Sequence, residues 1–112
     1  MGAIFKQTGD SIDYAPAADV ASGDVVVQGE LVGVAKLDIK ANNLGALAVA
    51  GVFDFPKATG GGTFIAAGVK AYWDEVAKVA TVDAAGGANK YIGKTVAEAS
   101  DAATSVRIRL DQ

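Results

Sequence analysis

Apolar and polar residues alternate along this chain in short stretches that predict β-strands. Residues 105–110 are the clearest case, because three apolar residues alternate with Ser105, Arg107 and Arg109. A period of two places the apolar side chains on one face of a strand and the others on the opposite face. We therefore expect a half-buried strand with a basic outer face.

The stretch from residue 46 to residue 74 is the centre of the predicted fold, because it holds three of the four Phe, the only Trp and one of the three Tyr. Residues 46–56 form an apolar run that Gly51 interrupts and Pro56 ends. Residues 70–74 form a second run, rich in aromatic residues. Runs of this composition bounded by Gly, Pro and Asp are typical of strands. Between them, Gly60, Gly61 and Gly62 predict a mobile loop, because glycine has the greatest backbone freedom.

Short strands separated by turn residues recur about every ten positions, which is typical of an all-β domain. We expect further strands at residues 11–15, 25–28, 31–37, 78–82 and 91–96, and one helical turn at residues 63–67. The pattern of residues 97–104 is ambiguous and predicts no particular element. Residues 25–28 are continuously apolar up to Gln28, so we expect both faces of that strand to be covered. The predicted fold is a small single-domain β-barrel or sandwich of short antiparallel strands with at most one short helix. Residues 1–10 would form an N-terminal arm and residues 11–112 a single β domain.

One segment of the sequence is echoed later in the chain. Residues 21–27 parallel residues 66–72, since each set places small residues and a glycine before a strand. Two similar halves would explain this echo, and so would the simple convergence of two hairpins.

Composition narrows the possible functions. The apolar fraction is 51%, but 23 of those residues are Ala and only 7% of the chain is aromatic. Such a core is thin, so additional burial through oligomerisation is expected. The net charge of −3 argues against a nucleic-acid partner, which requires clustered Lys and Arg. No apolar stretch approaches the roughly 20 residues that span a bilayer, so we expect no membrane partner.

The chain contains no Cys and no His. Disulfides, thiolate metal sites and cysteine nucleophiles are therefore excluded, as are the commonest general base and the commonest metal ligand. We expect no catalytic residue, no metal and no cofactor.

Gly93-Lys94-Thr95 has the last three residues of a phosphate-binding P-loop. That loop needs a Gly five positions before Gly93, where this chain has Ala88. Strands and turns therefore explain the motif better than a nucleotide site does. The acidic pairs Asp10 with Asp13 and Asp74 with Glu75 lack the spacing of a calcium loop, and Asp at predicted turns caps the backbone.

Other polar and aromatic residues have both a functional and a structural interpretation. Arg107 and Arg109 are able to grip a carboxylate or phosphate, but they also suit the solvated face of an edge strand. Tyr72 and Trp73 are able to stack on a ligand, although such residues are more often structural in a core poor in aromatics. The N-terminal segment with the apolar residues Ile4 and Phe5 has two interpretations. It would either add a strand to the edge of a partner's sheet or form the first strand of its own domain.

Several short motifs in order resemble the bacteriophage capsid cement, or head decoration, family. They are Phe5-x-Gln7-x-Gly9-Asp10, Ser22-Gly23-Asp24-x-Val26, Gly33-Val34-Ala35, Gly51-Val52-Phe53-x-Phe55-Pro56-Lys57-Ala58, Tyr72-Trp73-Asp74, Ile92-Gly93 and Val106-Arg107-Ile108-Arg109-Leu110. The resemblance spans essentially the whole chain. This chain has Gly68-Val69 where the family often has Gly-Asp, so that turn would differ in detail.

The resemblance implies a non-enzymatic protein that is made in the bacterial host cytoplasm and ends on the outer surface of the virion capsid. It would bind the shell of major capsid protein as a homotrimer. Ile4, Phe5 and Gln7 are the expected shell contacts, and Gly60, Gly61 and Gly62 a second contact or an exposed tip. The alternative is a small β-barrel module that binds a ligand or carbohydrate through Tyr72 and Trp73.

Overall fold

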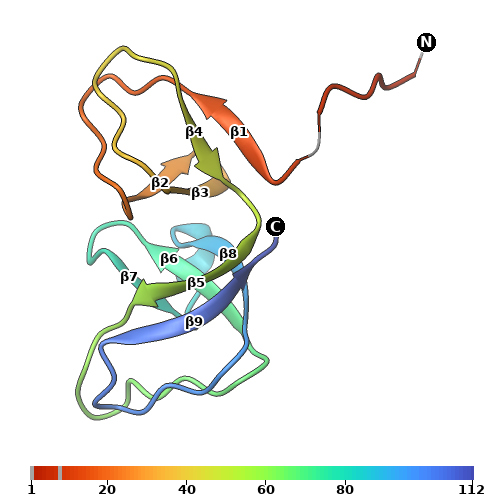
Figure 1. Cartoon of the computed structure of the whole chain (residues 1–112). Helices are drawn as coiled ribbons and strands as arrows, with labels where there is room; N and C mark the ends of the chain where they lie inside the picture. Colours follow the sequence, from red (N-terminus) through yellow and green to blue (C-terminus); the bar gives the residue numbers. More distant parts are fainter. Residues whose placement is uncertain (1, 8) are drawn as a thin grey trace.

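The structure is a computed structural model that describes residues 2–7 and 9–112 and contains two antiparallel sheets (Figure 1). The first sheet consists of β1 (Ser11–Tyr14), β2 (Val25–Gln28), β3 (Leu31–Ala35) and β4 (Gly45–Ala48), in the order β1-β4-β3-β2. The second consists of β5 (Gly51–Pro56), β6 (Lys70–Asp74), β7 (Val79–Thr81), β8 (Lys90–Thr95) and β9 (Ser105–Leu110), in the order β5-β9-β8-β6-β7. The all-β prediction is confirmed, and the two open sheets indicate a sandwich. A single parallel bridge between Lys57 and Ala80 also brings the two edges of the second sheet together.

One core joins the two sheets. Val32 and Val34 of β3 belong to the same buried cluster as Phe55, Trp73 and Ile108 of the second sheet. A smaller cluster lies within the first sheet, and its buried members are Ala35, Ile39 and Leu47. Because the aromatic residues are few, aliphatic side chains fill most of the main core.

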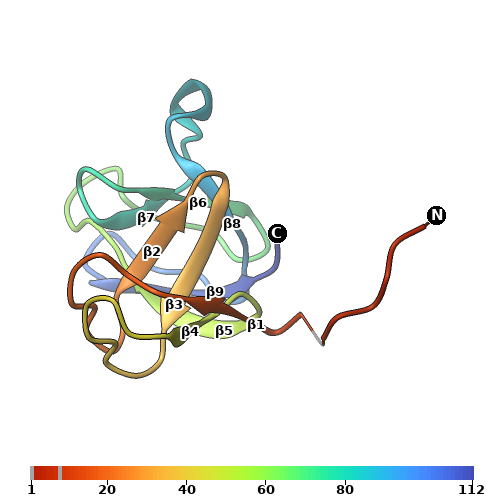
Figure 2. The ribbon, with the colours of Figure 1, turned by 90° about the horizontal axis from the view of Figure 1, so that it is seen from above.

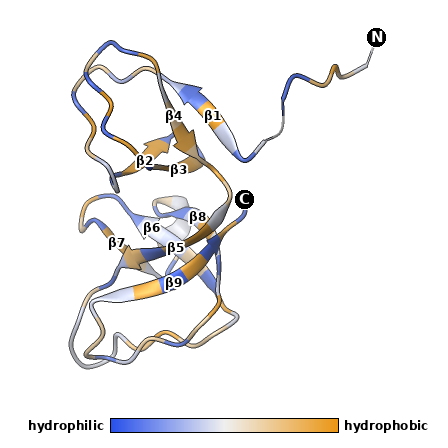
Figure 3. Ribbon diagram, viewed as in Figure 1, coloured by the Kyte–Doolittle hydropathy of each residue, from blue (hydrophilic) through white to orange (hydrophobic). Residues whose placement is uncertain are grey.

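The alternation predicted for residues 105–110 is confirmed. Val106, Ile108 and Leu110 are buried, while the residues between them are exposed. Figure 3 shows the same change of hydropathy along β9. The predicted central stretch, however, is divided between the two sheets. Its first part forms β4, and the chain enters the second sheet at Gly51, whose φ of 125° favours glycine.

The two sheets repeat the same topology. In each sheet, the strand that comes first in the chain pairs with the strand that comes last, β1 with β4 and β5 with β9. The order β1-β4-β3-β2 therefore corresponds to β5-β9-β8-β6. An isolated bridge flanks each set, Val20 with Ile39 in one and Ile65 with Ala99 in the other. Gly23 and Gly68 donate equivalent backbone hydrogen bonds, to Ala35 and Thr95. The echo in the sequence thus corresponds to two structurally similar halves.

The main difference between the halves is a long connection in the second one. β2 and β3 are joined by two residues, whereas the connection from β6 to β8 contains β7 and the short 3-10 helix η1 (Ala85–Gly87). Figure 2 shows that the segment with η1 projects from the rest of the molecule.

Three expectations about individual elements are wrong. Residues 63–67 are not helical, because Ile65 is held by an extended bridge to Ala99. The strand predicted for residues 31–37 ends at Ala35, and Leu37 lies outside it and is exposed. The side chains of β2 are half-buried or exposed rather than fully covered. β2 is an edge strand, and its neighbours cover its faces only in part.

Candidate functional site

The N-terminal arm extends away from the two sheets (Figures 1 and 2). Ile4 is 69% exposed and Phe5 is 82% exposed. Residues 2–6 have no regular secondary structure, and the Gln7 side-chain amide donates a hydrogen bond to the carbonyl of Ser11 at 3.0 Å. Two large apolar side chains are therefore presented to solvent on an extended backbone.

The loop with Gly60, Gly61 and Gly62 is exposed, as expected, but it is hydrogen-bonded to the adjacent segment. The amide of Gly60 donates to the carbonyl of Asp101 at 2.9 Å, and the Thr63 hydroxyl bonds the Gly60 carbonyl at 2.6 Å. Figure 1 shows this loop beneath the second sheet, while the arm leaves the first sheet. The structure does not bring the two predicted contact regions together.

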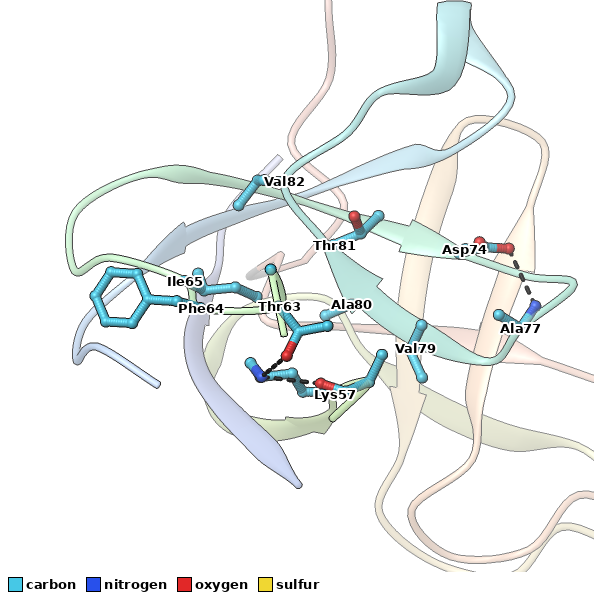
Figure 4. Close-up of a pocket in the computed structure, with 12 residues that line it drawn as sticks. Lys57, Thr63, Phe64, Ile65, Asp74, Ala77, Val79, Ala80, Thr81 and Val82 are labelled. Carbon is cyan, nitrogen blue, oxygen red and sulfur yellow. Dashed lines mark hydrogen bonds between the residues drawn. The ribbon is translucent and has the colours of Figure 1, made fainter. Parts of the chain in front are cut away.

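A buried lysine lies beneath that loop. Lys57 is only 5% exposed, and its Nζ donates to the carbonyl of Ala58 at 2.8 Å and to the Thr63 hydroxyl at 3.2 Å (Figure 4). It also donates to the carbonyl of Ala103 at 3.5 Å. A buried ammonium is tolerated when its donors are satisfied. Lys57 therefore ties the glycine loop to the segment before β9. The sequence pattern did not predict this role, although Lys57 belongs to one of the motifs that resemble the cement family.

A shallow cleft of about 310 Å³ lies beside Lys57. Figure 4 shows Phe64, Val79 and Val82 around it. Asp74 lines it as well, but its carboxylate accepts hydrogen bonds from the amides of Val76 and Ala77, which confirms its predicted role as a turn cap. Among the described residues, no cluster of three His, Cys, Asp or Glu side chains is placed to hold a metal ion.

The motif Gly93-Lys94-Thr95 lies within β8 and forms no loop. A Cβ atom at Gly93 would lie 1.9 Å from the Arg109 carbonyl oxygen, so this position requires glycine. The Thr95 hydroxyl is buried and bonds the carbonyl of Ala66 at 2.7 Å. These contacts explain the motif by packing.

The proposed aromatic platform is not available. Trp73 is 3% exposed, and its indole N–H donates to Glu75 at 3.1 Å. Tyr72 instead forms an edge-to-face pair with Tyr91, with ring centroids 5.7 Å apart. Because Trp73 is a core residue, the burial argues against a module that binds carbohydrate through Tyr72 and Trp73.

The two arginines of β9 have different environments. Arg107 forms two hydrogen bonds with Asp54, at 2.9 and 3.3 Å, and these bonds lower the pKa of that carboxylate below its ordinary 3.8. Arg109 instead has an exposed contact with Asp111 at 3.5 Å. The expectation of an edge strand here is wrong, since β9 lies between β5 and β8.

Comparison with known proteins identifies the family. A family model described as "Phage cement protein" matches residues 6–110. The chain belongs to the phage cement protein family. No curated protein and no solved structure matches it. Membership means a structural, non-enzymatic protein, and it implies association with the capsid and a place in the virion. Among the described residues, no helix is long and apolar enough to cross a membrane.

Proposed function

We propose that this cement protein binds the outer surface of the assembled phage head and stabilises it, and that it does so as a homotrimer. The observation that carries the proposal is the family match over residues 6–110. The division into an arm, residues 1–10, and one β domain, residues 11–112, is part of the proposal.

The arm is proposed as the principal shell contact. Ile4 and Phe5 are exposed on an extended segment, and an extended apolar peptide is suited to adding a strand to the edge of another sheet. The bond from Gln7 to Ser11 supports the arm where it leaves the domain. The loop of Gly60, Gly61 and Gly62 is proposed as a second contact or an exposed tip.

Stabilisation would follow from binding to the assembled state alone. A ligand that binds one state and not the other shifts the equilibrium by mass action. Each arm would make a weak contact, and three arms in a trimer would raise the overall affinity through effective concentration.

The test is co-sedimentation with expanded heads of the phage that encodes the chain. We expect deletion of residues 1–7 to abolish binding while the unfolding midpoint in urea stays nearly unchanged, because Ile4 and Phe5 are mostly exposed. Exchanging Ile4 and Phe5 for Ser would keep the length of the arm and remove its apolar side chains. Wild-type occupancy of the truncated protein would show that the arm is not the shell contact.

The glycine loop is tested in the same assay with Gly61→Arg. No atom lies within 4 Å of a Cβ at Gly61, so the domain should fold normally. Lower occupancy would place the loop at the shell, and unchanged occupancy would mark it as an exposed tip.

A further inference from the structure

Three cationic side chains form a row across the second sheet. Lys70 of β6 is paired directly with Lys94 of β8, and Lys94 is paired directly with Arg109 of β9. Directly paired residues of antiparallel strands lie on the same face with Cβ atoms about 5 Å apart, and like charges in such pairs are destabilising. All three residues are exposed. A chain with 10 cationic and 13 anionic residues thus places three cations side by side.

The charges of this row are largely uncompensated within the molecule. Lys70 and Lys94 have no ion-pair partner among the described residues, and Arg109 has the exposed contact with Asp111. On the same face lie the half-buried pair Tyr72 and Tyr91, and exposed Val52 lies opposite Arg109. We call this surface the basic face, with the residues Val52, Lys70, Tyr72, Tyr91, Lys94 and Arg109. Tyr and Arg are enriched in protein interfaces.

The net negative charge of the chain arises in its first half. Residues 1–49 contain six Asp and Glu against three Lys, whereas residues 50–112 contain seven of each sign. Four of those six carboxylates have partners within the molecule, and they are Asp19, Asp24, Glu30 and Asp38. The carboxylates of Asp10 and Asp13 have no partner among the described residues.

Asp13 lies in β1, which is an edge strand of the first sheet, and Asp10 immediately precedes that strand. Asp13 is paired with Ala46, which lines an apolar cleft of about 600 Å³ together with Leu37 and Leu44. Leu37 is 78% exposed and Leu44 is 72% exposed. Lys36 and Asp38 also line the cleft, with opposite charges. We call this surface the acidic face, with the residues Asp10, Asp13, Leu37 and Leu44.

We propose that the basic face of one copy of this chain binds the acidic face of a second copy. The tyrosines and Val52 would cover the exposed leucines, and the cations would meet Asp10 and Asp13. Exposed ion pairs add little affinity by themselves, but complementary charge fixes orientation and speeds association. The contact uses two different surfaces, so copies would join head to tail and close into a ring when the rotation permits. The inference rests on the homotrimer of the proposed function and names the surfaces that would join its copies. Its failure is distinguishable from a failure of capsid binding, because co-sedimentation with heads measures that binding separately.

The experiment is sedimentation equilibrium of the full chain at several micromolar concentrations. Salt of 0.1 M and 1 M gives Debye lengths of about 10 and 3 Å, so we expect weaker association at the higher concentration. We expect Lys94→Glu to weaken association at least about tenfold, because it places a carboxylate opposite Asp10 and Asp13. The same substitution replaces two like-charge pairs by attractive ones, so its melting temperature should be no lower than that of the wild type.

Two further variants test the pairing of the faces. Asp13→Lys should weaken association as Lys94→Glu does, and the double variant should recover most of the lost affinity. Lys40→Glu is the matched control, because Lys40 is exposed and lies outside both faces. It should associate like the wild type.

The proposal is overturned if the wild type is a monomer at every concentration and salt, or if Lys94→Glu associates like the wild type. It is also overturned if the double variant stays dissociated, since the basic face would then meet a surface of the second copy that does not include Asp13.

Discussion

Three consecutive residues of β8 have three different environments. Gly93 lies against the backbone of β9, Lys94 points to solvent, and the Thr95 hydroxyl accepts from the amide of Val69 at 3.1 Å. The glycine of the sequence Gly-Lys-Thr is therefore explained by the close approach of two strands. A motif with incorrect spacing has to be weighed against such packing requirements before a ligand is assigned to it.

Gly93→Ala should destabilise the domain strongly. The new Cβ would lie 1.9 Å from the Arg109 carbonyl oxygen, which belongs to a neighbouring strand and is unable to move without disturbing the sheet. We expect a loss of about 3 kcal/mol in the free energy of unfolding, measured in urea. Gly61→Ala is the matched control, since no atom lies within 4 Å of its Cβ, and it should change the free energy by less than about 0.5 kcal/mol. Equal stability of the two variants would contradict the close approach.

At the scale of elements, alternation and turn residues were sufficient to place most strands. Residues 105–110 form β9 with the predicted buried face, and the predicted boundaries of β6 and β2 agree with the structure. Which strands lie next to one another in a sheet was not predictable in the same way. Alternation assigns the two faces of a strand but says nothing about what lies at its edges, so the interior position of β9 was missed. The absence of a helical turn at residues 63–67 was missed because it depends on the bridge between Ile65 and Ala99.

The turn between β6 and β7 should make stability dependent on pH. Partial burial on its own raises the pKa of Glu75, but hydrogen bonds from Lys78 and the Trp73 indole outweigh it and bring the pKa below its ordinary 4.5. A carboxylate whose pKa is lowered by folding stabilises the folded state above its unfolded pKa. That contribution is lost as the pH falls through the lowered value.

Glu75→Gln should therefore be less stable than the wild type near neutral pH, by at most about 1 kcal/mol because the pair is largely exposed. The difference should shrink as the pH falls below about 4.5, measured as urea midpoints across a pH series. Glu98→Gln removes the same charge from an exposed residue without an ion-pair partner among the described residues. A difference that persisted in acid would show that the Glu75 charge is not responsible.

At the scale of the whole molecule, contacts between distant parts of the chain join the two halves. Glu30 contacts Lys90 at 3.0 Å, and the Gln112 side chain forms two hydrogen bonds of 2.7 Å with the backbone of Val32. No local pattern predicts a pairing across 80 residues. For the same reason, the sequence identified Arg107 and Arg109 as basic but did not show that Arg109 continues a row with Lys70 and Lys94. For Ile4 and Phe5 the sequence left two interpretations open, an arm and a first strand of the domain, and the structure places both residues outside any strand and exposed.

The shared core and the Gln112 contact predict that both sheets unfold together. Far-UV circular dichroism reports on all strands, whereas Trp73 fluorescence reports on the second sheet, so the two urea transitions should coincide. Gln112→Ala should lower the midpoint of both by the same amount, because it leaves the N–H and C=O of Val32, a fully buried residue, without these partners. The expected cost is about 1–3 kcal/mol. Gln112→Glu is the comparison, since its carboxylate still accepts from the Val32 amide but no longer donates to the Val32 carbonyl. If circular dichroism changed before Trp73 fluorescence in Gln112→Ala but not in the wild type, this contact would couple two sheets that otherwise unfold separately.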